Sequence, residues 1–198
     1  MSRTATAGPE QATDRRTARE RLLDAADDLF YAEGIHTVGI DRIIESAGVA
    51  KASLYSTFGS KDELVRAYLA VRHDRIQARV ERHVAAHTDP RDRVLAVFDA
   101  QAERFAEPDY RGCAFTAAAA ESPSGSAAVE ETERYRGWLL GVLTDLTREA
   151  GARDPEALAR RLQMIYDGAG LAFRIDHLPT AGQESRDVAA ALLDAALA

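Results

Sequence analysis

The sequence predicts an all-α fold of about nine helices, arranged as a short N-terminal group joined by one long helix to a larger bundle. No alternating run of β-branched residues occurs, and the helix-forming residues Ala, Leu, Arg and Glu dominate. Apolar residues recur three and four positions apart along most segments, which is the period of an amphipathic helix.

The first helix is expected over 14–33. Its apolar stripe includes Leu22, Ala26 and Phe30, and Gly34 ends it because glycine tolerates the left-handed turn after a helix. The preceding residues are polar and lack the apolar segment of a secretory signal, so we expect a loose tail there.

Residues 34–63 predict two short helices joined by a tight turn. Ile40, Ile43 and Ile44 form one apolar face, and Gly48 permits a sharp turn. In the following helix, 51–58, Leu54 and Phe58 point inward. Small and hydroxylated side chains then face outward with Lys51 and Tyr55, where a duplex could approach closely. This is the build of a helix-turn-helix, whose second helix lies in the major groove of DNA.

Residues 47–55 and 58–64 also resemble the tetracycline-repressor-like (TetR) family of bacterial regulators nearly position by position. The resemblance is dense over about forty residues and becomes vague after about residue 75. It implies a three-helix DNA-binding domain over 1–60 and a ligand-binding and dimerisation domain over 61–198.

The resemblance also implies specific DNA contacts. The Tyr55 hydroxyl and Lys61 would each bind a phosphate, whereas Lys51 would reach either a phosphate or a base edge, with guanine O6/N7 as the natural target. The other expected groove residues are Ala52, Ser53, Ser56 and Thr57. Gly39 departs from the family pattern of Ser or Thr, because glycine can cap a helix but brings no hydroxyl to a phosphate. Tyr55 as a half-buried aromatic and Lys61 as an ordinary first-turn residue are the alternatives.

The long fourth helix should begin at a capping box formed by Ser60 and Glu63. Two Asp-Pro pairs, at 89–90 and 154–155, predict helix starts with an N-cap followed by proline. The remaining helices are expected over 61–87, 90–105, 110–121, 127–150, 155–178 and 184–197, with a loop at 122–126.

An internal cavity is expected in the second half, mainly because members of the family commonly bind small molecules there. The candidate lining residues are Phe98, Phe105, Phe115, Tyr135, Trp138, Tyr166, Phe173 and His177. A mostly apolar or aromatic effector with few polar groups would suit them. The alternative for each is an ordinary core aromatic.

The last two helices are expected to form a homodimer interface. Glycine is costly inside a helix, and a close helix–helix approach would explain its presence at 168 and 170. The candidate interface residues are Gly168, Ala169, Gly170, Val188, Ala191, Leu192 and Ala195. A small-residue packing site within one monomer is the alternative.

The net charge of −7 predicts weak non-specific DNA binding without precluding specific binding. The chain has only two lysines, Lys51 and Lys61, which bracket the proposed recognition helix. The single cysteine, Cys113, excludes an intrachain disulfide, fits a reducing cytoplasm and is expected to be buried and inert. No apolar run approaches the roughly 20 residues of a membrane helix.

Enzyme and metal motifs are absent from the sequence. His83 and His87 are four residues apart but lack an acidic partner between them, and no HExxH, glycine-rich phosphate loop or CxxC occurs. We therefore expect no cofactor. The predicted function is a dimeric transcriptional repressor that binds a palindromic operator in double-stranded DNA and is released by a small molecule. The alternative is a small-molecule-binding bundle without DNA binding.

Overall fold

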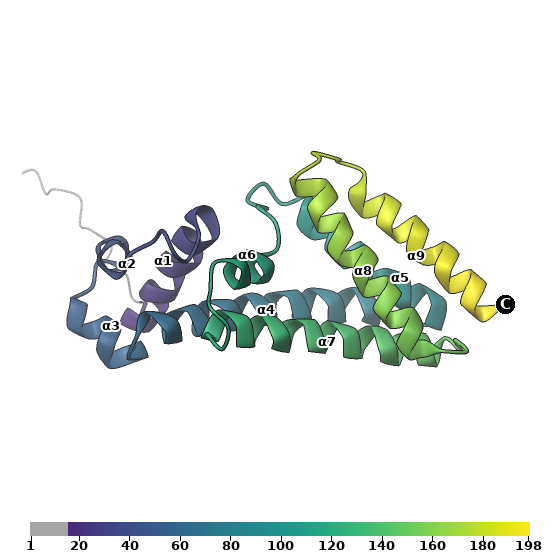
Figure 1. The fold of residues 1–198 in the computed structure, drawn as a ribbon, viewed down its shortest axis with the longest axis horizontal. Coiled ribbons are helices and arrows are strands. Elements are labelled where there is room, and N and C mark those ends of the chain that lie inside the picture. The colour runs from purple at the N-terminus through teal and green to yellow at the C-terminus, as the bar shows by residue number, and fades with distance from the viewer. Residues whose placement is uncertain (1–15) are drawn as a thin grey trace, which may run out of the picture.

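The computed structural model describes residues 16–198 and folds them into nine α-helices without a strand in that range (Figure 1). The predicted fold class is therefore confirmed. The tail and the first residues of the expected first helix lie outside the described residues. The helices are α1 (Ala18–Glu33), α2 (Ile40–Ala47), α3 (Lys51–Phe58), α4 (Lys61–Ala85), α5 (Pro90–Phe105), α6 (Ala114–Ala120), α7 (Ala127–Glu149), α8 (Pro155–Arg174) and α9 (Ala181–Leu197).

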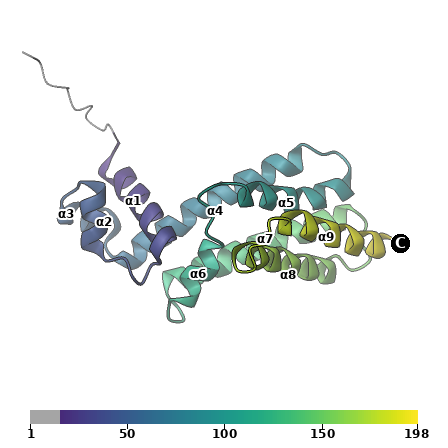
Figure 2. The same cartoon turned by 90° about the horizontal axis from the view of Figure 1, so that it is seen from above.

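The described part of the molecule is elongated, with α1–α3 at one end and the C-terminus at the other (Figures 1 and 2). The long helix α4 runs from the first group into the bundle, where it packs on α5 and α7. Helices α8 and α9 pack on each other and on α7 and α5, respectively. One continuous apolar core joins all of these elements, from Leu22 on α1 to Leu193 on α9.

The turn between α2 and α3 has the conformation that the sequence predicts. Gly48 adopts φ 61° and ψ 41°, a left-handed geometry in which its N–H donates to carbonyls in the last turn of α2. The Arg21 guanidinium donates to the Gly48 carbonyl at 3.2 Å and so attaches the turn to α1. Ile43 and Leu54 are completely buried on either side of the turn, and this burial fixes the angle between the two helices.

The capping boxes differ from the prediction. Ser60 caps α4 by accepting from the Glu63 N–H at 3.1 Å, but the Glu63 carboxylate pairs with Arg66 at 3.3 Å. The reciprocal arrangement occurs at α1, where Thr17 and Glu20 cap each other's backbone donors. The prediction at Ser60 was therefore half right, because a guanidinium one turn further along α4 competes for the carboxylate.

Two helix starts were predicted wrongly. The sixth helix begins at Ala114 rather than 110, because Gly112 adopts φ +105° and breaks any continuous helix before it. The ninth begins at Ala181, and Gly182 in its first turn lies against α5. A Cβ at Gly182 would come within 2.7 Å of the Ala102 Cβ, so glycine permits this close approach.

Within the described residues, none of the helices combines the length and the apolar character that crossing a membrane requires.

Candidate functional site

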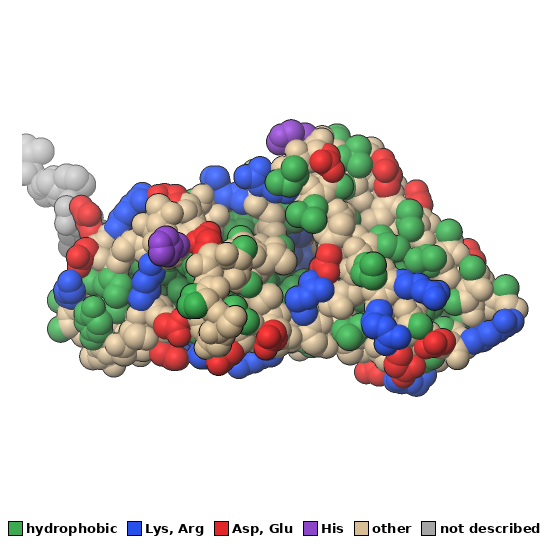
Figure 3. Space-filling model, viewed as in Figure 1, with side chains coloured by type: hydrophobic (Ala, Val, Ile, Leu, Met, Phe, Trp, Pro, Cys, Tyr) green, Lys and Arg blue, Asp and Glu red, His purple; other side chains and the backbone are tan. Residues whose placement is uncertain are grey.

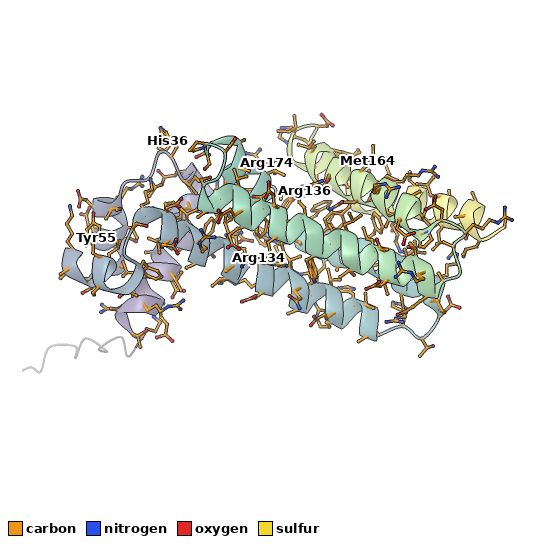
Figure 4. The ribbon with its side chains drawn as sticks, turned by 60° about the horizontal axis from the view of Figure 1, so that its bottom comes forward. His36, Tyr55, Arg134, Arg136, Met164 and Arg174 are labelled. Carbon is orange, nitrogen blue, oxygen red and sulfur yellow. The ribbon has the colours of Figure 1, made fainter. Side chains whose placement is uncertain are left out.

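Helix α3 presents its polar side at the end of the molecule farthest from the C-terminus (Figure 4). Leu54 is fully buried, whereas Tyr55 is 46% exposed, which is unusual for a large aromatic side chain. Ser53 is half-buried and its carbonyl accepts the Ser56 hydroxyl at 3.1 Å. The other predicted groove residues are exposed, namely Lys51, Ala52, Ser56 and Thr57. The structure therefore leaves most of the predicted groove residues of α3 accessible to solvent.

Lys51 is held beside an acid of the preceding helix. Its Nζ lies 2.8 Å from an Asp41 carboxylate oxygen, and both side chains are mostly exposed. The hydrogen bond to Asp41 and the charge of that carboxylate raise the pKa of Lys51. The Asp41 carboxylate therefore competes for Lys51 with any anion that approaches this side of α3.

Lys61 lies in the first turn of α4 and is half-buried. Burial lowers the pKa of this ammonium, opposed by the charge of Glu121. Its Nζ lies 5.9 Å from the centre of the Phe30 ring, a cation–π distance. A phosphate at this position would therefore meet a cation that is only partly hydrated.

Gly39 is the exposed N-cap of α2 and makes no side-chain capping bond. A Cβ built at Gly39 would meet nothing within 4 Å, so packing does not require glycine there. The departure from the family pattern removes a hydroxyl without a structural gain that we can identify.

Sequence reasoning missed one cation near this surface. Arg42 on α2 is exposed and makes a two-pronged pair with Glu33 at the end of α1, with one N–O distance of 2.7 Å. The signal was available, because Arg42 lies on the polar face of the short helix that precedes the turn.

The second candidate site is a partly open cavity of about 680 Å³ lined by α4, α5, α6, α7 and α8 and by the loop between α5 and α6. Of the predicted lining residues, Phe105, Phe115, Tyr135 and Tyr166 lie on its wall. Phe115 and Tyr135 stack with ring centres 4.2 Å apart. Burial raises the pKa of Tyr135 well above its usual value and that of Tyr166 to about 12. Both phenols therefore stay protonated at neutral pH.

Gln101, one of the residues that line the cavity, carries an unsatisfied buried polar atom. The buried Gln101 amide donates to the Tyr166 carbonyl at 2.8 Å, while its side-chain oxygen has no hydrogen-bond partner among the described residues. A buried acceptor without a partner costs about 1–3 kcal/mol.

Four predicted lining residues do not reach this wall: Phe98, Trp138, Phe173 and His177. Phe98 is fully buried in the main core, and Phe173 stacks on Phe105, whose ring centre is 4.8 Å away, in a small separate cluster. These two are ordinary core aromatics, which was the alternative reading of the pattern.

The other two residues were misplaced for different reasons. Trp138 packs on His73, with ring centres 5.1 Å apart, and is half-buried against the main core. His177 lies in the exposed loop between α8 and α9, at φ 54°. The turn rotates this residue away from the bundle, which a helical spacing argument could not anticipate.

Tyr31 lines the cavity although it belongs to α1, and sequence reasoning missed it. Its hydroxyl donates to the Gly112 carbonyl at 2.9 Å and accepts from the Arg111 N–H at 2.8 Å. The Arg72 guanidinium lies 3.6 Å from the centre of its ring. Nearby, Glu121 at the end of α6 accepts from the His36 N–H at 2.8 Å. The cavity wall is thus bonded directly to α1 and to the loop that follows it.

Helices α8 and α9 expose an apolar face. Met164, Leu171 and Ile175 are 72%, 64% and 65% exposed, and their spacing places them on one side of α8. Figure 4 shows Met164 at the outer surface of the bundle. On α9, Val188 is 49% exposed. The predicted interface residues Gly168, Ala191 and Ala195 are also exposed.

The other predicted interface residues face inward. Ala169 is buried in the small cluster with Phe105, and Gly170 lines the cavity near the Tyr110 hydroxyl. Leu192 is half-buried against the main core. These three residues thus take part in packing within the chain.

Two further expectations concern reactive side chains. His83 pairs with Glu103 at 2.7 Å and His87 is exposed, and the described residues contain no cluster of three or more metal-ligating side chains. Cys113 was expected to be buried. It is half-buried at the N-cap of α6, where it packs against the core and lines the cavity.

The first of these sites lies in a segment that the chain shares with known proteins. Residues 22–68 match the family model of bacterial regulatory proteins of the tetR family. The transcriptional activator FasR of Mycolicibacterium smegmatis is 38% identical over 94 residues, which are 48% of this chain and 42% of FasR. The chain thus spans less than half the length of that relative. The regulator LmrA of Bacillus subtilis is 28% identical over 71% of this chain and 76% of its own.

Solved structures extend the likeness over almost the whole chain. A TetR-family transcriptional regulator from Streptomyces coelicolor is 34% identical and superimposes with a TM-score of 0.85, covering 91% of this chain and 96% of that one. A tetR-type regulator from Streptomyces avermitilis is 32% identical, with a TM-score of 0.79 and coverages of 91% and 98%.

Proposed function

We propose that this chain, which belongs to the TetR family of DNA-binding transcriptional regulators, is a repressor that a small molecule releases from a palindromic operator. Its relatives are regulators and not enzymes. The alternative of a bundle without DNA binding loses its basis, since the family is one of DNA-binding proteins. The observation that carries the proposal is that one continuous apolar core connects α3 to the cavity. This core contains Leu54 of α3 and the cavity residues Phe115 and Tyr135.

The DNA contacts in this proposal are those of α3 and its flanks. Tyr55 and Lys61 bind phosphates, which position the protein, and Lys51 reaches a phosphate or a base edge. The neighbouring Ala52, Ser53, Ser56 and Thr57 allow close approach to the groove, and Gly39 offers backbone donors at the start of α2.

The active form in this proposal is a homodimer formed through α8 and α9. The exposed stripe of Met164, Leu171 and Ile175 supports it, because monomeric proteins rarely leave such a row of large apolar side chains in water. Gly168 in the middle of the stripe would let the two copies of α8 approach closely. Twofold symmetry would then present two recognition helices to a palindrome with half-sites one or more helical turns apart.

The effector acts, in this proposal, by favouring a conformation in which the two α3 helices no longer fit the operator. Support comes from Tyr31, which lies on α1 and on the cavity wall at once. The long helix α4 provides a second connection, since Arg72, Ile76 and Arg79 line the cavity. We propose a DNA-binding domain at 1–60, an effector and dimer domain at 61–198, and a cytoplasmic location.

The test is binding of the purified protein to fragmented genomic DNA from its source, followed by sequencing of the bound fragments. One or a few palindromic sites should be enriched. The double variant Tyr55→Phe with Lys61→Ala should lose them, whereas Arg153→Ala, which removes an exposed cation from the α7–α8 loop, should retain them. Absence of enrichment at low salt, with and without candidate effectors, would contradict the proposal.

Repression and release need a second measurement. A reporter placed behind the enriched site should be silenced by the protein, and an effector should restore it. A rise in reporter expression on adding the protein alone would instead make it an activator, the role that the name of FasR states for that relative. A broad effector screen that leaves operator affinity unchanged would refute release.

A further inference from the structure

We propose that the cavity binds an organic anion, a carboxylate on an apolar body, with the carboxylate held by Arg111 and Arg174. This inference rests on the proposed effector site and names the chemical class of its ligand. It differs from the mostly apolar effector that the predicted aromatic lining suggested, because the wall of the cavity carries more guanidinium than carboxylate groups.

Seven arginines line the cavity, and most of them are neutralised by a carboxylate. Asp27 forms ion pairs with both Arg72 and Arg75. Arg79 is paired with Glu103 and Glu107, and Arg104 is paired with Glu107 and Asp109. Arg136 is paired with Asp167. The lining arginines are Arg72, Arg75, Arg79, Arg104, Arg111, Arg136 and Arg174. Five carboxylates therefore face seven guanidinium groups, which leaves an excess of positive charge.

The excess lies on Arg111 and Arg174. Neither guanidinium has a carboxylate within ion-pair distance among the described residues, and both side chains are exposed. Figure 4 shows Arg174 near the end of α8 on the side of the molecule that also carries Arg136. In Figure 3, basic side chains gather over the saddle between the α1–α3 end and the raised end of the bundle.

The backbone holds these two arginines together. The Arg174 Nε donates to the Arg111 carbonyl at 3.0 Å, and the Arg111 N–H donates to the Tyr31 hydroxyl. Gly112 adopts φ +105°, and a Cβ there would touch the Arg174 side chain at 3.5 Å. The Arg174 Nη atoms and the whole Arg111 guanidinium remain available for a carboxylate, which guanidinium binds in a two-pronged geometry.

The interior of the cavity suits an apolar body. Phe105, Phe115 and Ile76 lie on its wall together with the rings of Tyr110, Tyr135 and Tyr166. A volume of about 680 Å³ falls within the range of sites for drug-sized molecules. A cationic ligand should bind weakly, because the acidic lining residues are already paired with arginines. These residues are Glu107, Asp109 and Asp167.

The test compares matched ligands by isothermal titration calorimetry without DNA. The probes are 2-naphthoate against 2-naphthamide, and decanoate against decanamide, so that each pair shares a body and differs in charge. The native chain should bind at least one carboxylate about tenfold more tightly than its amide, the gain expected of a charge-assisted hydrogen bond. The preference should shrink at high salt, because part of the attraction is exposed to solvent.

The variants Arg111→Gln and Arg174→Gln should each reduce the preference for carboxylate over amide, and together they should abolish it. Arg153→Gln is the matched control, since it removes an exposed guanidinium outside the cavity lining and should leave the preference unchanged. The ratio of the two affinities is the decisive quantity. Damage to the fold would weaken both members of a pair and leave their ratio unaffected.

Equal affinity for acid and amide, an undiminished ratio in the double variant, or no binding of either carboxylate at millimolar concentration would overturn the proposal. Because the titration contains no DNA, this result is independent of operator binding. A carboxylate that binds as expected but fails to release the operator would refute the proposed release mechanism and leave the ligand class intact.

Discussion

Replacing Leu171 with glutamate should convert the proposed dimer into a monomer. Leu171 occupies the middle of the exposed stripe on α8, between Met164 and Ile175. The substitution leaves the monomer core intact, because 64% of the leucine is already exposed. Its effect should therefore fall on association and spare the free energy of unfolding of the single chain.

The size of the effect follows from burial. Fully burying a Leu, Ile or Met side chain contributes about 1.5–3 kcal/mol. Three side chains per subunit, each about two-thirds exposed, give about 6–12 kcal/mol for a dimer before the entropic cost of association. Glutamate at residue 171 removes two leucines from the interface and buries two carboxylates, at several kcal/mol for each ion. Dimerisation should weaken by about 4 kcal/mol or more, roughly a thousandfold.

Sedimentation velocity over low-micromolar concentrations measures this directly. The native chain should sediment as a dimer and Leu171→Glu as a monomer. Ala78→Glu is the control, because it adds the same charge at an exposed position on α4 and should remain dimeric. A dimeric Leu171→Glu, or a monomeric native chain, would show that the α8–α9 face is not the interface.

Three further predictions concern the DNA-binding end and the core. Asp41→Asn should strengthen operator binding severalfold in a fluorescence anisotropy titration, because it releases Lys51 and removes a charge that repels phosphate; unchanged or weaker binding would contradict this. Leu54→Ala should lower the free energy of unfolding by about 2–5 kcal/mol in a urea titration, since the side chain is fully buried. A decrease of less than about 1 kcal/mol would show that the Leu54 side chain does not anchor α3. Burial lowers the pKa of His73, so this imidazole binds a proton more readily in the unfolded chain than in the folded one. The free energy of unfolding is therefore unaffected by this group above about pH 6.5 and decreases as the pH falls below that value. His73→Phe should therefore flatten the fall in melting temperature between about pH 7 and pH 5.5, and an equally steep fall in the variant would refute the assignment.

The α2–α3 unit was predictable because its determinants are local. Gly48 permits the left-handed turn, and the side chains of Ile43 and Leu54 are buried on either side of it. The outward residues of α3 then follow from the helical period alone. No long-range contact had to be known, and the predicted exposure of Lys51 and Tyr55 is confirmed.

The cavity and the α8–α9 face depend on how each helix is rotated against its neighbours. Consecutive helical residues point about 100° apart, so Gly168, Ala169 and Gly170 could not all share one interface. Gly168 faces outward, whereas the other two pack inside. A signal for the true stripe existed in the spacing of Met164, Leu171 and Ile175. Nothing in the sequence indicated that Tyr31, more than seventy residues earlier than Arg111, would complete the cavity wall.

The net negative charge of the chain affects how its DNA-binding end can interact with DNA. Two of the cations there are held by neighbouring carboxylates, Lys51 by Asp41 and Arg42 by Glu33. When a phosphate replaces such a carboxylate, the released acid recruits a cation from solution, which offsets part of the counterion release that drives non-specific binding. The salt dependence of operator binding should therefore be shallower than the number of phosphate contacts implies. In the proposed regulator, an operator would then be recognised chiefly through the fit of α3 to the groove. The spacing of the two α3 helices in the proposed dimer would be the quantity that an effector changes.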